Sequence, residues 1–328
     1  MLPANRRAPA LARQWLPHVL CGRNRSNNAR NTSLKDAHTC ISCRSRFGAD
    51  GGKKSFESGC FLLAFLGGTM KRTNILKAGA VCMALAAGSG AFAQDGRAIL
   101  QKVLDVKEPD FTHALVTMEL IEKDGTVSES RTVEEYGRSK DGLASLVMVF
   151  KSPASVKDTR FLQVENSGKA DDKWIYLPAL RTTRRVAASQ GSQSFMGTDV
   201  TYDDMSTREL DDDTHELLGE ETKNGFSCWK IKSTPVNAST SQYQYRIQWI
   251  DKNTSVPIYA EMYDKKGNLI KVLTVEKLEN ISGYDIPTVD VLKNVQTGHA
   301  TRLVISKIVV DKPIPDRVFT ESFLNTGK

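Results

Sequence analysis

The chain has 328 residues, a formal net charge of +7 and a pI near 9.0, values typical of proteins that bind nucleic acid or acidic membranes. The excess charge is confined to one end. Residues 1–93 hold 14 Lys or Arg against 3 Asp or Glu, whereas the other 235 residues hold 31 against 35. Cys228 is the one cysteine after residue 93, so this larger part has no internal disulfide. The composition excludes a nucleic-acid-binding role for it.

A secretion signal lies well inside the numbering. Met70 opens a short positive stretch, residues 78–87 are mostly apolar and uncharged, and residues 91–93 give the small-x-small pattern that signal peptidase cleaves. Cleavage is expected between Ala93 and Gln94, with a periplasmic product. The apolar stretch is shorter than the roughly 20 residues that span a bilayer, so we expect no integral membrane protein.

Residues 1–69 precede this signal and have no sustained hydrophobic period. We interpret them as a mis-called extension of a chain that starts at Met70, with a disordered basic arm as the alternative. Cys40 and Cys43 have the spacing of half a zinc or redox motif, but no second pair follows at metal spacing. We interpret this pair as chance.

The exported part is expected to begin with an amphipathic helix and to continue as strands. Residues 95–106 place apolar side chains at helical spacing, and apolar residues then recur at every second position. In residues 241–250 the alternation predicts one face that is buried and one that is exposed. The expected buried face consists of Tyr243, Tyr245, Ile247 and Trp249, and the exposed face of Gln242, Gln244, Arg246 and Gln248. The other expected strands are 112–121, 129–137, 143–151, 159–165, 173–177, 180–186, 214–221, 226–233, 257–263, 269–278 and 300–310.

These consecutive strands, with tight turns between many of them, predict a mainly β fold of the α+β class. Hairpin signals such as Asp124-Gly125, Asp141-Gly142 and Asn224-Gly225 favour antiparallel pairing. A sheet of this size must curl, because twist accumulates and open edges are costly. We therefore expect one domain, 94–328, built as a large antiparallel sheet curled into an incomplete β-barrel with short helices at its mouth. The helix and residues 187–213 are expected to cover its second face.

Two neighbouring motifs carry a family resemblance. Residues 172–186 contain the pattern W-x-Y-L-P-A-L-R, and residues 194–205 contain S-F-M-G-T-D followed by Y-D-D-M. The sequence here resembles the bacterial outer-membrane lipoprotein-sorting proteins, which are similar to the periplasmic carrier LolA and its receptor LolB. This resemblance implies an unclosed barrel with helices at its mouth and an apolar cavity for lipid chains. It also implies an inner-membrane exporter of the resistance-nodulation-division (RND) type as a partner.

The first motif supplies candidate ligand-binding residues. Trp174 and Tyr176 alternate with apolar neighbours on an expected strand, and Arg181, Arg184 and Arg185 give the next strand a basic edge. These arginines are suited to a phosphate or another acidic head group at the cavity rim. The alternative is a solvated face whose arginines pair with nearby acids. The other candidate ligand-binding residues are Tyr243, Tyr245, Ile247 and Trp249 of the later strand.

The second motif places two large apolar residues, Phe195 and Met196, between Gly191 and Gly197. We interpret the segment as a hinged lid whose apolar side chains fill the empty cavity, because Met adapts to varied shapes. The alternative is a loop that is simply anchored on the core.

Sites for catalysis or metals lack sequence support. The acids at 203, 204 and 211–213 lack the spacing of a calcium loop, and the exported part has no nucleophile elbow, phosphate loop or zinc-protease motif. We expect no enzyme, no cofactor and no bound metal. The predicted function is that of a monomeric periplasmic carrier of lipoprotein or lipid acyl chains toward the outer membrane, with an exporter adaptor or an envelope-lipid hydrolase as alternatives.

Overall fold

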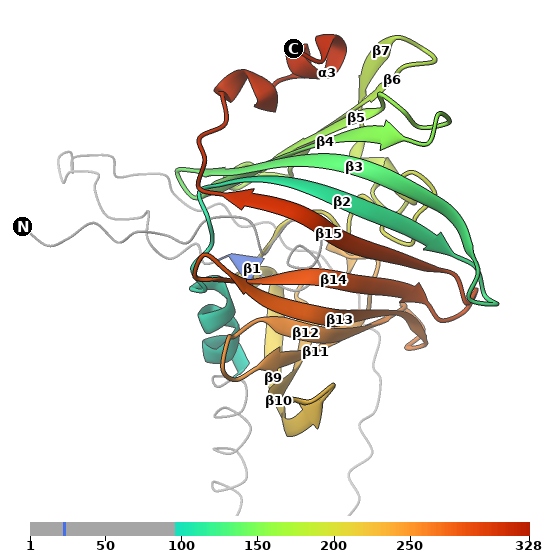
Figure 1. Cartoon of the computed structure of the whole chain (residues 1–328). Coiled ribbons are helices and arrows are strands. Elements are labelled where there is room, and N and C mark those ends of the chain that lie inside the picture. The colour runs from blue at the N-terminus through green and yellow to red at the C-terminus, as the bar shows by residue number, and fades with distance from the viewer. Residues whose placement is uncertain (1–21, 24–95) are drawn as a thin grey trace, which may run out of the picture. The chain divides into compact units, whose positions relative to one another are not determined.

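The computed structural model describes residues 22–23 and 96–328, and its main element is one 13-stranded antiparallel sheet (Figure 1). The strands are β2 (Phe111–Ile121), β3 (Val127–Lys140), β4 (Leu143–Ser152), β5 (Arg160–Val164), β6 (Asp172–Leu177), β7 (Thr182–Arg185), β9 (Asp213–Lys223), β10 (Phe226–Pro235), β11 (Tyr245–Asp251), β12 (Pro257–Tyr263), β13 (Leu269–Ile281), β14 (Tyr284–Asn294) and β15 (Ala300–Val310). Outside this sheet are the helix over residues 96–104, β1 (Gly22–Arg23), which pairs with β8 (Arg208–Glu209), the short helices η1 (Ala188–Gln190), η2 (Leu210–Asp212), η3 (Ala238–Thr240) and η4 (Asp316–Phe319), and α3 (Glu321–Thr326).

The sheet is built from two arms that meet at its centre. Strands β2 to β7 follow one another toward one edge, strands β15 to β9 follow one another toward the other, and β2 pairs with β15. The edge strands β7 and β9 do not pair with each other, so the curled sheet stays unclosed (Figure 1). The prediction of a large, unclosed antiparallel sheet is confirmed.

Three hairpins close through two-residue turns with positive φ at both positions. Asp141 and Gly142 connect β3 to β4, and Asn224 and Gly225 connect β9 to β10. This backbone conformation matches the right-handed twist of the flanking strands, which is why Asp-Gly and Asn-Gly are strong hairpin signals. The third such turn, at residues 282–283, joins β13 to β14.

Strand β14 was not among the predicted strands. Its turn has Ser in place of Asn or Asp, and Pro287 lies within it, which argues against a central strand because proline has no N–H to donate. The structure accommodates this proline because the paired register of β14 with β15 begins at Val289. Pro287 lies outside that paired stretch.

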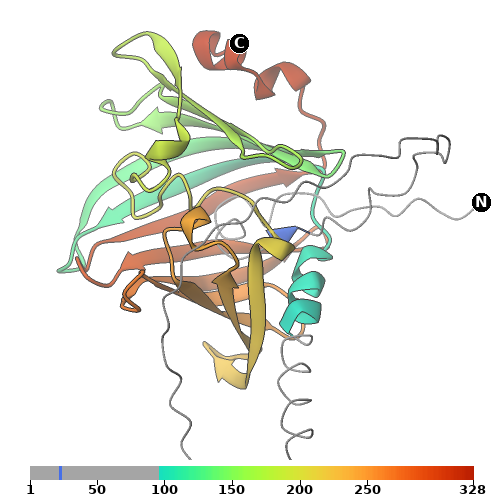
Figure 2. The same cartoon turned by 180° about the vertical axis from the view of Figure 1, so that it is seen from behind.

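Helical segments cover parts of both faces of the sheet. The helix over residues 96–104 packs Ile99, Leu100 and Leu104 against Ile231 of β10 and Ile250 of β11. The C-terminal segment with η4 and α3 packs on the opposite face, against β4 and β5. The long connection from β7 to β9 lies within the hollow of the sheet (Figure 2). Within residues 22–23 and 96–328, no helix has the length and apolar character that a membrane crossing needs.

Candidate functional site

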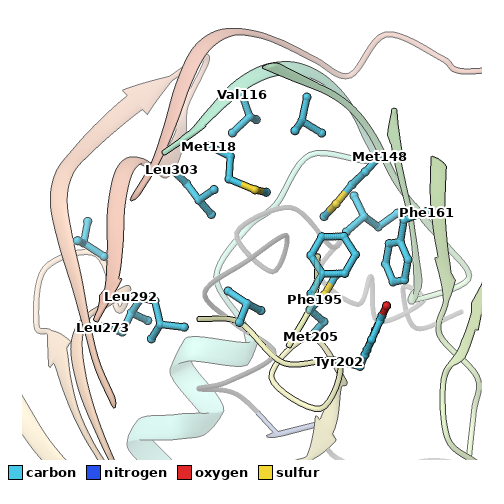
Figure 3. Close-up of a cluster of buried hydrophobic side chains, with 14 of the residues drawn as sticks. Val116, Met118, Met148, Phe161, Phe195, Tyr202, Met205, Leu273, Leu292 and Leu303 are labelled. Carbon is cyan, nitrogen blue, oxygen red and sulfur yellow. The ribbon is translucent and has the colours of Figure 1, made fainter. Parts of the chain in front are cut away.

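The concave face of the sheet carries a broad group of buried apolar side chains. Residues that lie opposite each other in antiparallel strands share a face. The register pairs Met118 with Leu303 and Leu273 with Leu292, and all four side chains are buried. They point into the hollow of the sheet together with Val116 (Figure 3). This surface is the candidate binding site.

A segment of the β7–β9 connection, residues 191–206, occupies part of the hollow, and we call it the plug segment. Its central residue Phe195 is fully buried, at 0% exposure. The ring centroid of Phe195 lies 5.0 Å from that of Phe161 and 5.7 Å from that of Tyr202, both in edge-to-face geometry. Met205 joins the same cluster (Figure 3). Burying an aromatic side chain of this size stabilises the docked segment by roughly 2 to 3 kcal/mol.

A tight turn holds Phe195 in place. The amide of Phe195 donates to the carbonyl of Val200 at 2.7 Å, and the hydroxyl of Thr198 donates to the carbonyl of Phe195 at 2.7 Å. Met196 and Gly197 at the turn have φ of 53° and 80°. Glycine adopts this left-handed conformation at no steric cost, which explains a Gly directly after the two large apolar residues.

Gly191 has a different role from the one expected. Its φ of −54° is ordinary for any residue, so conformational freedom is not what this position requires. A Cβ at Gly191 would overlap the carboxylate of Asp203. The expectation that both glycines act as hinges is therefore wrong for Gly191, which permits close packing within the plug segment.

A buried ion pair fastens the end of the plug segment. The carboxylate of Asp204 lies 2.6 Å from the Nζ of Lys271 on β13, and their side chains are 0% and 8% exposed. The hydroxyl of Tyr243 donates to the same carboxylate at 2.5 Å. Burial and the nearby Asp204 raise the pKa of Tyr243 well above its usual value, so its hydroxyl stays protonated as a donor.

Two further contacts fasten the middle of the plug segment. The carboxylate of Asp199 accepts a hydrogen bond from Thr301 at 2.8 Å and lies 2.7 Å from Nδ1 of His299. Arg131 of β3 donates to the carbonyl of Met196 at 2.7 Å while it is ion-paired with Glu129. The plug segment is thus bound by an aromatic cluster and by polar contacts to three strands.

The predicted orientation of strand 241–250 is wrong for β11. The register places Gln248 opposite Ala260 and Arg246 opposite Met262, so these polar residues lie on the concave face, at 1% and 4% exposure. Arg246 is buried there with Asp213, at 2.8 Å. Tyr245, Ile247 and Trp249 point to the convex face. Tyr243 precedes the strand and contacts the plug segment instead.

The aromatic residues of β11 pack with aromatic residues of β12. The rings of Tyr245 and Tyr263 stack at 4.4 Å, and Trp249 meets Tyr259 edge to face at 5.1 Å. Lys230 lies 4.7 Å from the ring centroid of Trp249. Lysine side chains cover these rings, so the alternating aromatic residues are shielded although they point away from the interior.

Trp174 and Tyr176 also lie on the convex face, because the register places Ile175 between them on the concave face, opposite Phe161. Both pack against the C-terminal segment that contains Phe323. They are therefore not on the candidate binding surface, contrary to the prediction. Their alternation was detected, but the sequence did not reveal which face the C-terminal segment covers.

The three predicted rim arginines are solvent-exposed. Arg181 lies in the turn before β7 with φ of 49°, and Arg185 forms an ion pair with Asp172. This pair matches the alternative of a solvated basic face. Arg184 lies opposite Ile175, on the side of the sheet that faces the plug segment.

A polar pocket of about 350 Å³ adjoins the plug segment. Its walls come from the β5–β6 loop, the end of the plug segment and the residues before β11. The acids that sequence analysis considered for calcium are partly neutralised here, because Asp213 pairs with Arg208 and Arg246, and Asp204 pairs with Lys271.

Sequence reasoning missed the residues that fasten the plug segment. Asp199 and Asp204 lie within the recognised motif, but their partners Lys271, His299 and Arg131 are distant in sequence. The sequence offered one signal for these partners. It is a charged residue at a strand position where the alternation otherwise places an apolar, inward-pointing side chain. The expected strand 269–278 contained Lys271 in such a position.

Comparisons with known proteins agree with this architecture. A family model with the description "Uncharacterized protein" matches residues 142–326, more than half of the chain. No curated protein matches the chain. A DUF1329 family protein from Desulfovibrio piger is 28% identical with a TM-score of 0.67, and the match covers 71% of this chain and 99% of that one.

Two further solved structures are similar. A domain named for outer membrane lipoprotein sorting, from Vibrio parahaemolyticus, is 28% identical with a TM-score of 0.66, covering 71% of this chain and 99% of that one. A LolA superfamily protein from Nitrosomonas europaea is 20% identical with a TM-score of 0.54, covering 70% and 98%, and shares the fold. The chain thus belongs to the family of the matching model, and it has a LolA-like fold.

Proposed function

We propose that this protein is a periplasmic carrier that binds the acyl chains of lipoproteins or lipids on the concave face of its sheet and moves them toward the outer membrane. The observation that carries this proposal is the apolar concave surface around Met118, Leu273 and Leu303, part of which is occupied by a separately fastened segment. The similarity to a domain named for lipoprotein sorting supports it.

An acyl chain needs no catalytic group to be held on such a surface. Transfer of each CH₂ from water contributes about 0.8 kcal/mol, so a chain of roughly a dozen carbons has ample free energy for binding. The cargo and the plug segment would compete for the same concave surface. In this proposal Phe195 and Met196 occupy the site when cargo is absent and leave it when cargo binds.

The expected export of the chain is consistent with the same role. The signal pattern that begins at Met70 would direct the protein to the periplasm, and residues 1–93 lie outside the described part of the chain apart from Gly22 and Arg23. Release of an acyl chain requires a competing apolar acceptor, which a membrane partner would supply. We propose an inner-membrane exporter of the RND type as such a partner, and a monomeric carrier between the membranes.

The test is binding of a fluorescent long-chain fatty acid to the mature chain. Leu303→Gln places an amide on the concave face and is expected to weaken probe binding roughly tenfold, which corresponds to about 1.4 kcal/mol. Leu218→Gln is the matched control, because Leu218 is 41% exposed on β9. Absence of probe binding to the wild type, or equal binding by a folded Leu303→Gln variant, would contradict the proposal.

A further inference from the structure

Two carboxyl groups interrupt the apolar concave face. Asp290 of β14 lies opposite Leu303, and Glu135 of β3 lies opposite Ala114, both members of the concave cluster. The two acids are 7% and 2% exposed. Their inward direction follows from the register, because opposite residues of antiparallel strands share a face.

Asp290 differs from the other acids buried on this side of the sheet. Asp204 is paired with Lys271 and Asp213 with two arginines, whereas the carboxylate of Asp290 has no hydrogen bond or ion pair with any residue in the described ranges 22–23 and 96–328. Burial raises the pKa of Asp290 well above its usual value, and Glu135 adds to this. A buried carboxylate without a partner is costly, so a cation is strongly favoured beside it.

A second unsatisfied group lies on the same face. The hydroxyl of Thr112 on β2 has no hydrogen-bond partner among the described residues, and Thr112 is 1% exposed. Thr112 lies opposite Gly137, two positions along β3 from Glu135. Thr112 and Glu135 are therefore diagonal neighbours, and they form a second polar spot on the concave face, separated from Asp290 by β15.

We propose that Asp290 binds the protonated amine of an amphiphile whose acyl chain lies on the concave apolar surface, with Glu135 as a further negative charge on the same face. This inference rests on the proposed carrier function and specifies its cargo. A primary ammonium group donates three hydrogen bonds and pairs with carboxylates, while the same acids repel phosphate and carboxylate head groups. Both an aminolipid and a lipidated peptide with a free terminal amine have this chemistry.

The test compares three probes of equal chain length, dodecylamine, dodecanol and dodecanoate, as competitors of a fluorescent acyl probe on the mature chain. The wild type is expected to bind dodecylamine at least tenfold more tightly than dodecanol, and dodecanoate more weakly. Asp290→Asn should abolish the preference for the amine, so that dodecylamine and dodecanol bind with similar affinity. Glu135→Gln should reduce the preference, and Asp141→Asn, in an exposed turn, should retain it.

A second arm identifies the source of the amine. A diacylated peptide is compared with its N-acetylated form, and stronger binding of the free-amine form supports a lipidated peptide, whereas a preference confined to dodecylamine supports an aminolipid. Equal binding of dodecylamine and dodecanol, or an amine preference that persists in Asp290→Asn, overturns the inference while the carrier function stands. Failure of all probes to bind overturns both.

Discussion

Asp290 makes the stability of the protein depend on pH in a defined direction. Burial raises its folded-state pKa above the value of about 3.9 in an unfolded chain. The folded protein therefore holds this proton more tightly, so the stabilising contribution is complete below the unfolded pKa and is lost as pH rises toward the folded pKa. Each unit of raised pKa corresponds to about 1.4 kcal/mol of lost stability.

The variant Asp290→Asn has no such loss. Its free energy of unfolding, measured with urea, should match the wild type more closely at pH 4 than at pH 8, where the variant should be the more stable protein. Asp141→Asn serves as the control for an exposed acid and should track the wild type throughout. A difference between Asp290→Asn and the wild type that stays constant with pH would contradict this expectation.

For individual residues, the sequence was least informative about which face of the sheet the side chains of β11 point to. An alternation of aromatic and polar residues correctly indicates a strand. It also predicts that the aromatic face is buried, but this holds only if the polar face is exposed to water. Here Arg246 is paired with Asp213, and Gln248 accepts a hydrogen bond from Ser233 at 3.1 Å. These partners lie on other strands, so no local pattern reveals that the polar face is buried.

The plug segment is the element on which the proposed carrier mechanism depends. Lys271→Met removes the cation that neutralises the buried Asp204 and should destabilise the docked segment, because breaking a buried ion pair typically costs about 3 to 5 kcal/mol. If cargo and plug compete, the variant should bind a fluorescent fatty acid roughly tenfold more tightly or better. Lys307→Met is the matched control at an exposed position of β15.

A loop that is merely an anchor has the opposite signature. The Lys271→Met variant would then melt at a lower temperature and bind the probe with unchanged or weaker affinity. The double change Asp204→Asn with Lys271→Met removes both charges and should recover part of the lost stability. Melting temperature and affinity, measured on the same preparations, distinguish the two mechanisms.

The elements themselves were largely predictable. Strands with strict alternation and Asp-Gly or Asn-Gly turns appear close to their expected bounds, because local twist and side-chain period determine them. The helix over residues 96–104 also matches its apolar spacing. Strand β14 was missed because it contains Pro287. A proline fits into a strand only where the strand is unpaired on the side of the missing N–H. Whether Pro287 is unpaired there depends on where the pairing with β15 begins, which the sequence does not show.

For the molecule as a whole, the beginning of the mature chain remains a prediction. Cleavage after Ala93 would place the new N-terminus at Gln94, two residues before Gly96, where the larger described range begins. Intact-mass measurement of the periplasmic protein should therefore give a chain of residues 94–328. Ala93→Leu should block cleavage, since signal peptidase requires a small residue there. A periplasmic species that retains residues before Met70 would contradict the prediction.

The two unpaired edges of the sheet have a mechanical consequence. Each of β7 and β9 has a single neighbouring strand within the sheet, so the two arms can move apart or together without breaking a ladder of backbone hydrogen bonds. A closed barrel has a circumference fixed by its strand number and stagger, whereas this sheet can change its curvature by small adjustments of twist. In the proposed carrier mechanism, the space beneath the sheet would expand for a bulky cargo and contract after delivery, while both arms flex about the central strands β2 and β15.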